Sequence, residues 1–471
     1  MPNGGGVRKA RRGNYPAICA GSPRIGGKYS GMDCGAGGET RFRPRRVLVA
    51  PRQRMADPSA RGFALVAGSQ YSLRASVPSG RRGCRDEERP MKITGVSTHV
   101  LVGRLEGRSF GWSQRVTGTR QAALCVVSTD AGIEGVGEAF YFGGPATVAA
   151  TLMRDGLGPL LAGCDPMDTS VIWDRLYNWT RDQGQKGLTI SALSAVDIAL
   201  WDLKGKALGV PVFTLLGGAY RNRARVYATG LYEPQGVPSV AAALVEEALG
   251  YKEAGFCGMK LKIGYDLQTD LKYIQAIREA IGPGALLMVD ANHAYNASEA
   301  VRLARAMEPH DIYWFEEPVP PEDLDGYLEV KRHSRIPIAG GECEYTRYGF
   351  RELINRRAVD ILQPDLCAMG GFSEMLKVIA MASAANLPVI PHVWGTSVGL
   401  AAALQLFAAL PHFPERRFPA EPLFEYDRSP HPFRDGVTRE RFAMQDGYLA
   451  IPDRPGLGVT LDLDFVRRFA G

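Results

Sequence analysis

Three carboxylates recur at a constant interval in the second half of the chain. Asp290, Glu316 and Glu342 each follow a short apolar run, and successive members are 26 residues apart. A single acid in such a position is ordinarily a helix N-cap or part of a surface ion pair, whereas three at equal spacing indicate one shared site. The set offers only carboxylate oxygens, which favour a hard cation, Mg²⁺ first and Mn²⁺ second.

Two lysines lie one apolar run before the first of these acids. Lys260 and Lys262 are two positions apart in "MKLKI", so on a β-strand both side chains lie on one face. On an edge strand they would be solvated, but inside a barrel they would be costly to bury unless anions or a metal-bound substrate lay opposite. In that second case the cation and the neighbouring ammonium lower each lysine's pKa, and one lysine becomes a candidate general base.

An acid and a histidine end two later apolar runs. Asp365 closes "QPD" and His392 closes "IPH". The ends of neighbouring strands lie about 5 Å apart, so the carboxylate can hold one tautomer of the imidazole and raise its basicity. Taken singly, either residue would be structural. Together, opposite the lysine pair, they suggest acid/base groups on two faces of one substrate.

These groups predict the removal of a proton next to a carboxylate. A divalent ion binds the substrate carboxylate and stabilises the enediolate that forms, a base on one side takes the proton, and a second group on the other side delivers or accepts one. If the β-carbon bears a leaving oxygen, β-elimination follows. If it does not, reprotonation gives racemisation or epimerisation.

A second acid comes directly after Glu316 in the stretch "IYWFEEP". Adjacent residues of a strand face opposite ways, so Glu316 and Glu317 should not share one role. Register with Asp290 and Glu342 selects Glu316 as the metal ligand. Glu317 is expected beside the site, bound to lysine or backbone donors, and Pro318 is expected to end the strand.

Short apolar runs alternate with amphipathic stretches through this part of the chain. The eight strands predicted from them span 225–229, 258–263, 286–292, 312–317, 336–342, 359–365, 387–393 and 421–427. This rhythm favours an α/β fold with a parallel barrel, whose chemistry gathers where the strands end. A doubly wound open sheet is the alternative, but no GxGxxG motif follows the first strand.

The stretch that begins at Met91 has a different pattern. Two β-rich segments, 92–105 and 120–140, are followed by a helical segment at 191–209 that stops at Gly209. This pattern predicts a first domain of the α+β class over 91–220.

The first 90 residues differ in composition from the rest. They contain 16 Arg and 2 Lys against 6 acidic residues and show no sustained period, which predicts a disordered basic extension. This extension is either a tail for an acidic partner or a solvated segment upstream of the natural start at Met91, and we favour the second reading. Residues 91–471 hold 38 basic and 44 acidic residues, so no nucleic-acid surface is expected there.

Cysteine usage and hydropathy argue against several other classes. The eight cysteines are scattered without CxxC spacing, so neither a zinc site nor a disulfide framework is implied, and a reducing cytoplasm fits. No run of about 18 apolar residues exists, and the N-terminus lacks an apolar signal core. Neither membrane insertion nor export is therefore expected.

In combination, the motifs resemble those of the enolase superfamily, in particular its mandelate racemase subgroup, whose sites pair a Lys or His base with Mg²⁺. The matching motifs are KLK at 260–262, DAN at 290–292, FEEP at 315–318, GGE at 340–342, QPD at 363–365 and PHVWG at 391–395. The resemblance implies a (β/α)7β modified TIM barrel over 221–427. It also implies a capping domain that 91–220 forms with a returning C-terminal segment, 428–471.

The resemblance also implies roles for individual residues. It assigns Mg²⁺ binding to Asp290, Glu316 and Glu342. It makes Lys262 one base, Lys260 the group that polarises the substrate carboxylate, and His392 with Asp365 the acid/base dyad of the opposite face. Substrate contacts are expected from Asn292, Trp394 and Glu425, the last as a protonated acid. Family members are multimers, so a homo-oligomer is expected.

The substrate implied is a sugar acid or its lactone. The stretches 181–194 and 424–435 resemble those of aldarolactone cycloisomerases, which open a lactone ring by β-elimination. Acid sugar dehydratases of the galactarate or talarate type share the barrel residues and are the alternative, followed by racemases and epimerases. The cap loops within 104–120 and 140–146 are expected to contact the distal end of the substrate, with the candidates Arg108, Trp112 and Tyr141.

Two other classes of protein compete with an enzyme. A non-catalytic sugar-acid binding protein would have no reason to keep Lys262 together with the His392 dyad. A regulatory or nucleic-acid role would have to reside in residues 1–90.

Overall fold

The computed structural model describes residues 91–140, 145–414 and 416–471. All of them belong to one unit of the chain, Arg82–Gly471. The predicted basic extension, 1–90, and the candidate Tyr141 lie outside the described residues.

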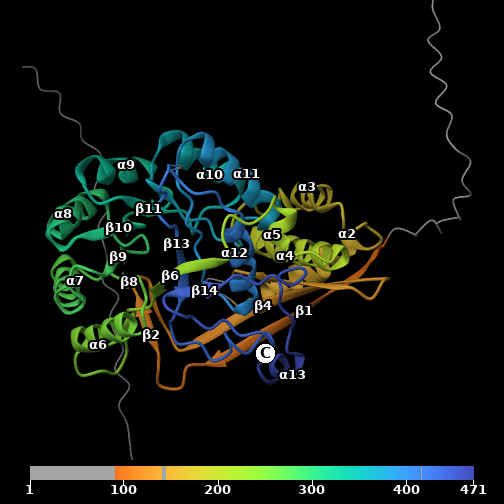
Figure 1. Ribbon diagram of the computed structural model, residues 1–471, viewed down its shortest axis with the longest axis horizontal. Helices are drawn as coiled ribbons and strands as arrows, with labels where there is room; N and C mark the ends of the chain where they lie inside the picture. The colour runs from red at the N-terminus through yellow and green to blue at the C-terminus, as the bar shows by residue number, and fades with distance from the viewer. Residues whose placement is uncertain (1–90, 141–144, 415) are drawn as a thin grey trace, which may run out of the picture. The chain divides into compact units, whose positions relative to one another are not determined.

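The first part of the described chain is an antiparallel sheet covered by helices (Figure 1). Its strands are ordered β1 (Ile93–Arg104), β4 (Thr119–Thr129) and β5 (Glu134–Ala139). The helical elements that follow are α1 (Ala146–Thr151), the π-helical turn Leu152–Leu157, α2 (Gly158–Leu161), α3 (Thr169–Thr180), α4 (Leu188–Leu208) and α5 (Val212–Leu215). This is the α+β arrangement that the sequence predicts for 91–220.

Helix α4 packs unusually close to strand β5. A Cβ atom at Gly135 would lie 1.9 Å from the carbonyl oxygen of Ala199, and one at Gly137 would lie 2.0 Å from that of Ala195. Residues two apart on a strand lie on one face, and so do residues four apart on a helix. The two glycines therefore give β5 a face without side chains, against which the backbone of α4 packs. Only glycine permits this approach.

The second part is a curved parallel sheet with helices along its outside (Figure 1). Its strands are ordered β12 (Ile361–Leu362), β11 (Ile338–Gly340), β10 (Ile312–Glu316), β9 (Leu286–Asp290), β8 (Gly258–Lys262), β6 (Arg223–Thr229) and β13 (Leu423–Asp427). The outer helices are α6 (Val240–Glu253), α7 (Leu267–Ile281), α8 (Ala297–Met307), α9 (Leu324–His333), α10 (Thr346–Arg356), α11 (Gly371–Ala384) and α12 (Ser397–Ala409). The short turn Glu308–His310 follows α8.

The seventh predicted strand, 387–393, is not a regular strand. It contacts its neighbour only through two isolated parallel bridges, Leu362 with Val389 and Asp365 with His392. Pro388 and Pro391 lack the backbone N–H that a ladder requires, which explains the interruption. The segment still occupies the seventh barrel position, and the fold is the predicted (β/α)7β barrel with a capping domain.

Alternation along the strands decides which side chains enter the barrel. Met288 and Trp314 belong to an apolar cluster that also contains Tyr227, Ala339, Ile390 and Leu423. Asp290 and Glu316 come two residues after Met288 and Trp314, on the same face of their strands. The acids therefore lie at the end of the barrel interior, above an apolar layer.

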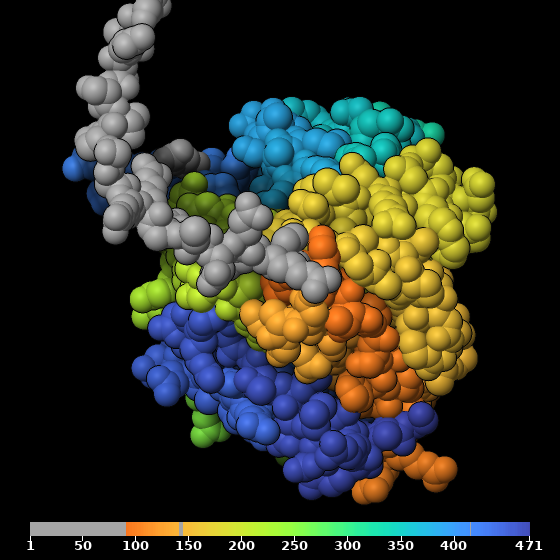
Figure 2. Space-filling model, turned by 90° about the vertical axis from the view of Figure 1, so that its right-hand side faces the viewer, coloured from red at the N-terminus to blue at the C-terminus, as the bar shows by residue number. Residues whose placement is uncertain are grey.

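The C-terminal segment returns to the first strand of the chain. The Val102 N–H donates to the Phe469 carbonyl at 2.8 Å, and the Gly471 N–H donates to the Val100 carbonyl at 3.1 Å. Helix α13 (Leu463–Arg468) precedes this contact, and Figure 2 shows the C-terminal segment in blue beside the N-terminal strands in orange. Strand β14 (Tyr448–Ala450) of the same segment pairs antiparallel with β6.

A small sheet joins the two parts of the unit. It pairs β3 (Arg115–Thr117) with β2 (Phe110–Trp112), and β2 with β7 (Glu233–Pro234) of the barrel. This sheet carries cap residues to the barrel mouth. Within the described residues, no helix combines the length and apolar character needed to cross a membrane.

Candidate active site

The three predicted metal ligands meet at the end of the barrel. Asp290 and Glu316 are the last residues of β9 and β10 and are register partners, while Glu342 follows β11 by two residues. Each is at most 1% exposed, and one carboxylate oxygen from each lies within 4.8 Å of the others. Gly341 has φ of 131°, a conformation that favours glycine, immediately before Glu342.

Both lysines of β8 point into this carboxylate cluster. Lys262 Nζ pairs with Asp290 Oδ2, and Lys260 Nζ lies 2.5 Å from Glu316 Oε1 and 2.8 Å from Glu425 Oε1. Lys260 is fully buried and Lys262 is 4% exposed. The alternative of solvated lysines on an edge strand is wrong, because β8 lies between β6 and β9.

The fall in lysine pKa is predicted for a site that holds a cation, and the protein groups alone act in the opposite direction. Burial lowers the pKa of Lys262, but Asp290, Tyr232 and Glu342 together outweigh burial and raise the pKa overall. Burial also raises the pKa of Asp290, yet Lys262 and Lys260 lower that pKa to about 2. The fall therefore stays a prediction for the metal-bound enzyme, in which the cation adds positive charge beside these carboxylates.

His392 and Asp365 form the predicted dyad. His392 Nδ1 lies 2.7 Å from Asp365 Oδ2, and Asp365 Oδ1 accepts a hydrogen bond from the Cys367 N–H at 2.7 Å. His392 Nε2 lies 3.2 Å from Glu342 Oε2, so the ring faces the metal-ligand candidates. Burial lowers the pKa of His392, but the nearby carboxylates, Glu342 foremost, raise it to about 10.

The triad is surrounded by more acids than bases. Among the described residues, its ion-pair network contains six carboxylates, of Asp290, Glu316, Glu317, Glu342, Asp365 and Glu425. It contains four basic side chains, of Lys260, Lys262, His293 and His392. If every one of these ten groups is charged, the network has a net charge of −2. Its candidate metal ligands are carboxylate oxygens, which are hard donors. A divalent cation such as Mg²⁺ or Mn²⁺ fits this donor set.

Two of the three predicted substrate-binding residues contact the lysines. Asn292 Oδ1 accepts from Lys262 Nζ at 3.0 Å, and Glu425 pairs with Lys260 and accepts from the Val393 N–H at 2.8 Å. Burial raises the pKa of Glu425, but Lys260 and His392 lower it to about 2. The expected protonated Glu425 is therefore disfavoured, because two cations hold it as a carboxylate.

A pocket adjoins the dyad. It is lined by Asp365 and His392 from the barrel, by the predicted Trp394, and by Arg120 and Phe140 from the cap strands. The wall of this pocket therefore combines side chains of the barrel and of the cap.

The structure places the two described cap candidates, Trp112 and Arg108, at different distances from the site. Trp112 is 8% exposed, and its ring centroid lies 6.4 Å from that of Trp394. Arg108 is exposed and does not line the pocket. Of the two candidates that the structure describes, it therefore brings only Trp112 close to the site.

Arg120 is the clearest residue that sequence reasoning missed. Its guanidinium carbon lies 3.8 Å from the Trp394 ring centroid, and the side chain pairs with Asp427 at 3.3 Å. Arg434 pairs with the same carboxylate at 2.7 Å, so the two arginines leave an excess positive charge beside the pocket. A charged residue inside the apolar start of the 120–140 segment was the available signal.

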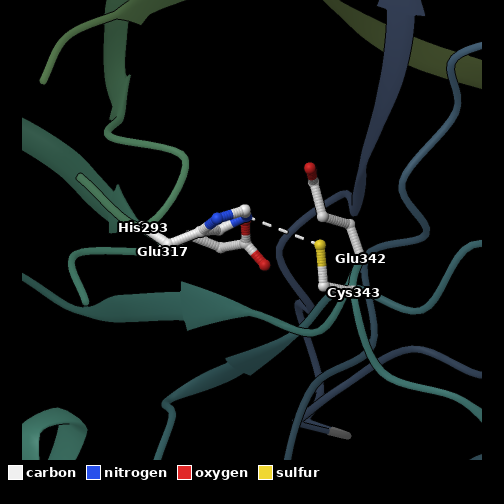
Figure 3. A group of neighbouring side chains, drawn as sticks. All are labelled: His293, Glu317, Glu342 and Cys343. Carbon is white, nitrogen blue, oxygen red and sulfur yellow. Dashed lines mark hydrogen bonds and ion pairs between the residues drawn. The ribbon is translucent and has the colours of Figure 1, made fainter. Parts of the chain in front are cut away.

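Glu317 has a different partner from the one predicted. Its backbone has φ of 43°, an uncommon conformation for a residue other than glycine. Its Oε2 lies 2.9 Å from His293 Nε2, so among the described residues its ion-pair partner is a histidine, and Figure 3 draws these two side chains next to each other. His293 also lies in the left-handed region, with φ of 62°. Burial lowers the pKa of His293, but Glu317 outweighs it and raises the pKa to about 9.

A parallel barrel that ends in a carboxylate triad, a lysine pair and a His–Asp dyad, under an α+β cap, defines an enzyme of the enolase superfamily. Residues 106–217 match the mandelate racemase / muconate lactonizing enzyme N-terminal domain. Residues 243–465 match the enolase C-terminal domain-like family. The chain belongs to the mandelate racemase / muconate lactonizing enzyme family.

Similar proteins carry the same two kinds of activity that the sequence left open. The chain is 45% identical over 379 residues to D-galactarolactone cycloisomerase of Agrobacterium fabrum, covering 80% of this chain and 99% of the relative. It is 36% identical over 380 residues to arabinonate dehydratase of Saccharolobus solfataricus, covering 80% and 93%. A solved 3,6-anhydro-D-galactonate cycloisomerase from Zobellia galactanivorans superposes with a TM-score of 0.72 at 40% identity, covering 81% and 99%.

Proposed function

We propose that this enzyme is an Mg²⁺-dependent aldarolactone cycloisomerase of the D-galactarolactone type. The observation that carries the proposal is the placement of two proton-transfer groups at opposite ends of one carboxylate triad. Lys262 pairs with Asp290 at one end, and His392 lies 3.2 Å from Glu342 at the other. The similarity to a lactone cycloisomerase over almost the whole of that relative supports the substrate class.

The metal in this proposal is held by Asp290, Glu316 and Glu342, with Mn²⁺ able to replace Mg²⁺. Bound there, the ion polarises the substrate carboxylate, offsets the charge that develops on it and weakens the hold of Asp290 on the Lys262 proton. Glu316 is fixed for this role by the Trp314 indole N–H at 2.9 Å and by the Gln363 amide at 2.7 Å.

The chain's own groups then divide the proton transfers. Lys262 takes the proton from the carbon next to the substrate carboxylate, and Lys260 holds that carboxylate by its charge. The electron pair of the C–H bond forms the new C=C bond as the bond from the β-carbon to the ring oxygen breaks. His392, oriented by Asp365, gives its Nε2 proton to that oxygen, so a lactone isomerises without loss of atoms.

An acid sugar dehydratase is the alternative, followed by a racemase or epimerase. With an open-chain sugar acid, the same steps would expel a hydroxyl group with the proton from His392, as water. The similarity to arabinonate dehydratase supports this alternative. The barrel residues serve both reactions, so the cap must select between substrates. We assign the distal end of the substrate to Trp112, Trp394 and Arg120, whose excess charge suits a polar or anionic group.

The organisation of the chain is also part of the proposal. We infer a capping domain over 91–220, a barrel over 221–427 and a returning segment over 428–471, supported by the hydrogen bonds of Phe469 and Gly471 to β1. We further propose a homo-oligomer, as the family resemblance implies. A reducing cytoplasm is proposed as its location, because all the cysteines that the structure describes are free.

NMR analysis of the products tests the choice between the two reactions. The enzyme with Mg²⁺ is supplied either with an aldarolactone or with the corresponding open-chain diacid. We expect the lactone to give a linear deoxy-keto acid of the same composition and the diacid to remain unchanged. Turnover of the diacid with loss of water, without turnover of the lactone, would reject the cycloisomerase in favour of the dehydratase.

A further inference from the structure

A second group of metal-ligating side chains lies beside the triad. His293, Glu317, Glu342 and Cys343 follow the ends of β9, β10 and β11, and one donor atom from each lies within 4.8 Å of the others (Figure 3). His293 Nε2 lies 2.9 Å from Glu317 Oε2 and 3.5 Å from Cys343 Sγ. Only Glu342 belongs to both groups.

Two carboxylate oxygens of this group are buried without hydrogen-bond donors. Glu317 Oε2 and Glu342 Oε2 belong to side chains that are 1% exposed, and neither accepts a hydrogen bond from the described residues. Each has only a histidine nitrogen at ion-pair distance, from His293 and His392 respectively. A buried oxygen in this state is costly, and a cation between His293 and Cys343 would satisfy Glu317 Oε2.

The donor set differs in chemistry from the triad. Nitrogen, sulfur and oxygen donors together suit Zn²⁺ or Co²⁺, whereas Mg²⁺ takes oxygen donors alone. Zinc bonds of about 2.3 Å to sulfur and about 2.0 Å to nitrogen, at a tetrahedral angle, separate those atoms by about 3.5 Å. The separation of Cys343 Sγ from His293 Nε2 is 3.5 Å, so these two ligands are already at the distance that such an ion requires.

The group is also accessible from solvent. The His293 side chain is 20% exposed, and Cys343 is half-buried. The Gln114 amide nitrogen lies 3.1 Å from His293 Nδ1 and donates to the Asn292 carbonyl at 2.6 Å, which leaves Nε2 as the ring nitrogen that faces Glu317 and Cys343. An ion can therefore reach the group without opening the barrel.

We propose that His293, Glu317 and Cys343 bind a thiophilic divalent cation such as Zn²⁺, with Glu342 as the fourth ligand, and that this binding withdraws Glu342 from the triad. The thiol proton and the Nε2 proton pass to solvent when the cation binds. The withdrawal of Glu342 rests on the proposed role of the triad, whereas the site itself does not. Zinc would thus weaken binding of the activating metal without competing for Asp290 or Glu316.

Cobalt absorption tests the site independently of turnover. Full-length protein, with Mg²⁺ present and a phosphine as the reductant, is titrated with Co²⁺. We expect a near-ultraviolet thiolate-to-cobalt band that saturates at one equivalent, is lost in Cys343→Ser and weakens in His293→Gln. The matched control is Cys164→Ser, a half-buried cysteine of the cap, which should retain the band. Absence of the band in the wild type, or its persistence in Cys343→Ser, would overturn the proposal.

Mn²⁺ paramagnetic resonance tests the withdrawal of Glu342. One equivalent of Zn²⁺ should weaken Mn²⁺ binding by about tenfold or more in the wild type, and should leave it unchanged in Cys343→Ser. Equal weakening in both proteins would show direct competition at the triad and refute the shared ligand. If Mn²⁺ fails to bind at all, the proposed role of the triad is wrong, and the cobalt band still decides the second site.

Discussion

At the scale of single residues, the site is organised by charge balance. Lys262 is buried, yet its pKa is raised, because Asp290, Tyr232 and Glu342 together outweigh burial. Neighbouring charges also outweigh burial at two other groups: they lower the pKa of Glu425 and raise that of His392. A divalent cation among these groups would change every one of these balances, so the enzyme's acid/base behaviour should depend on its metal.

The role of Asp365 can be separated from that of His392 by mutation. Asp365→Asn removes the negative charge that stabilises the imidazolium, and we expect kcat/KM to fall by about 10²-fold or more. His392→Asn removes the proton donor itself and should cost more. Both variants should keep the wild-type far-ultraviolet circular dichroism spectrum and ligand affinity. Wild-type activity in Asp365→Asn would contradict the dyad.

At the scale of elements, close packing between α4 and β5 fixes the cap. Gly135 and Gly137 admit the backbone of α4 against the strand, and the next residue of β5, Glu138, reaches the start of α12. The Thr396 and Gly399 N–H groups donate to the Glu138 carboxylate, both at 2.9 Å. Strand β5 therefore packs against α4 through its two glycines and also links the cap to the barrel through Glu138.

Gly137→Ala tests this packing. The added Cβ would meet the Ala195 carbonyl, and separating the strand from the helix should lower the free energy of unfolding by about 2 kcal/mol or more. The control is Gly95→Ala in β1, where a Cβ would meet no atom within 4 Å and the change should stay within about 0.5 kcal/mol. Thermal and urea unfolding measure both, and equal stability of the two variants would refute the close contact.

At the scale of the whole molecule, the site depends on segments that are distant in sequence. The C-terminal residues bond to β1, and β2 of the cap pairs with β7 of the barrel. Arg120 of β4 stacks on Trp394 and pairs with Asp427. The barrel carries the groups proposed to react, and the cap supplies the far wall of the pocket.

Removal of residues 1–90 tests how far this organisation is self-contained. Every residue of the proposed site lies after Met91, and alignment with 99% of the Agrobacterium relative uses only 80% of this chain. We expect the shortened protein to match the full-length chain in kcat/KM and melting temperature, and neither protein to show salt-dependent DNA binding. A loss of activity on truncation, or DNA binding by the full-length chain alone, would assign a function to residues 1–90.

The sequence by itself determined the barrel and the main chemical groups. A repeating strand and helix unit places each strand end at the same rim, so acids 26 residues apart, Asp290, Glu316 and Glu342, had to meet. Alternation along β8 likewise required Lys260 and Lys262 to share a face. These features follow from local periodicity and need no knowledge of long-range contacts.

Only the tertiary structure decided which groups surround those residues. It gave Glu317 the imidazole of His293 as a partner, brought Arg120 to Trp394 across 274 positions, and reduced the strand at 387–393 to two bridges. It also showed that carboxylates surround the lysines and, without a cation, raise the pKa of Lys262, because a pKa depends on the sum of all nearby charges and on burial. Those contacts join segments far apart along the chain, where spacing carries no information.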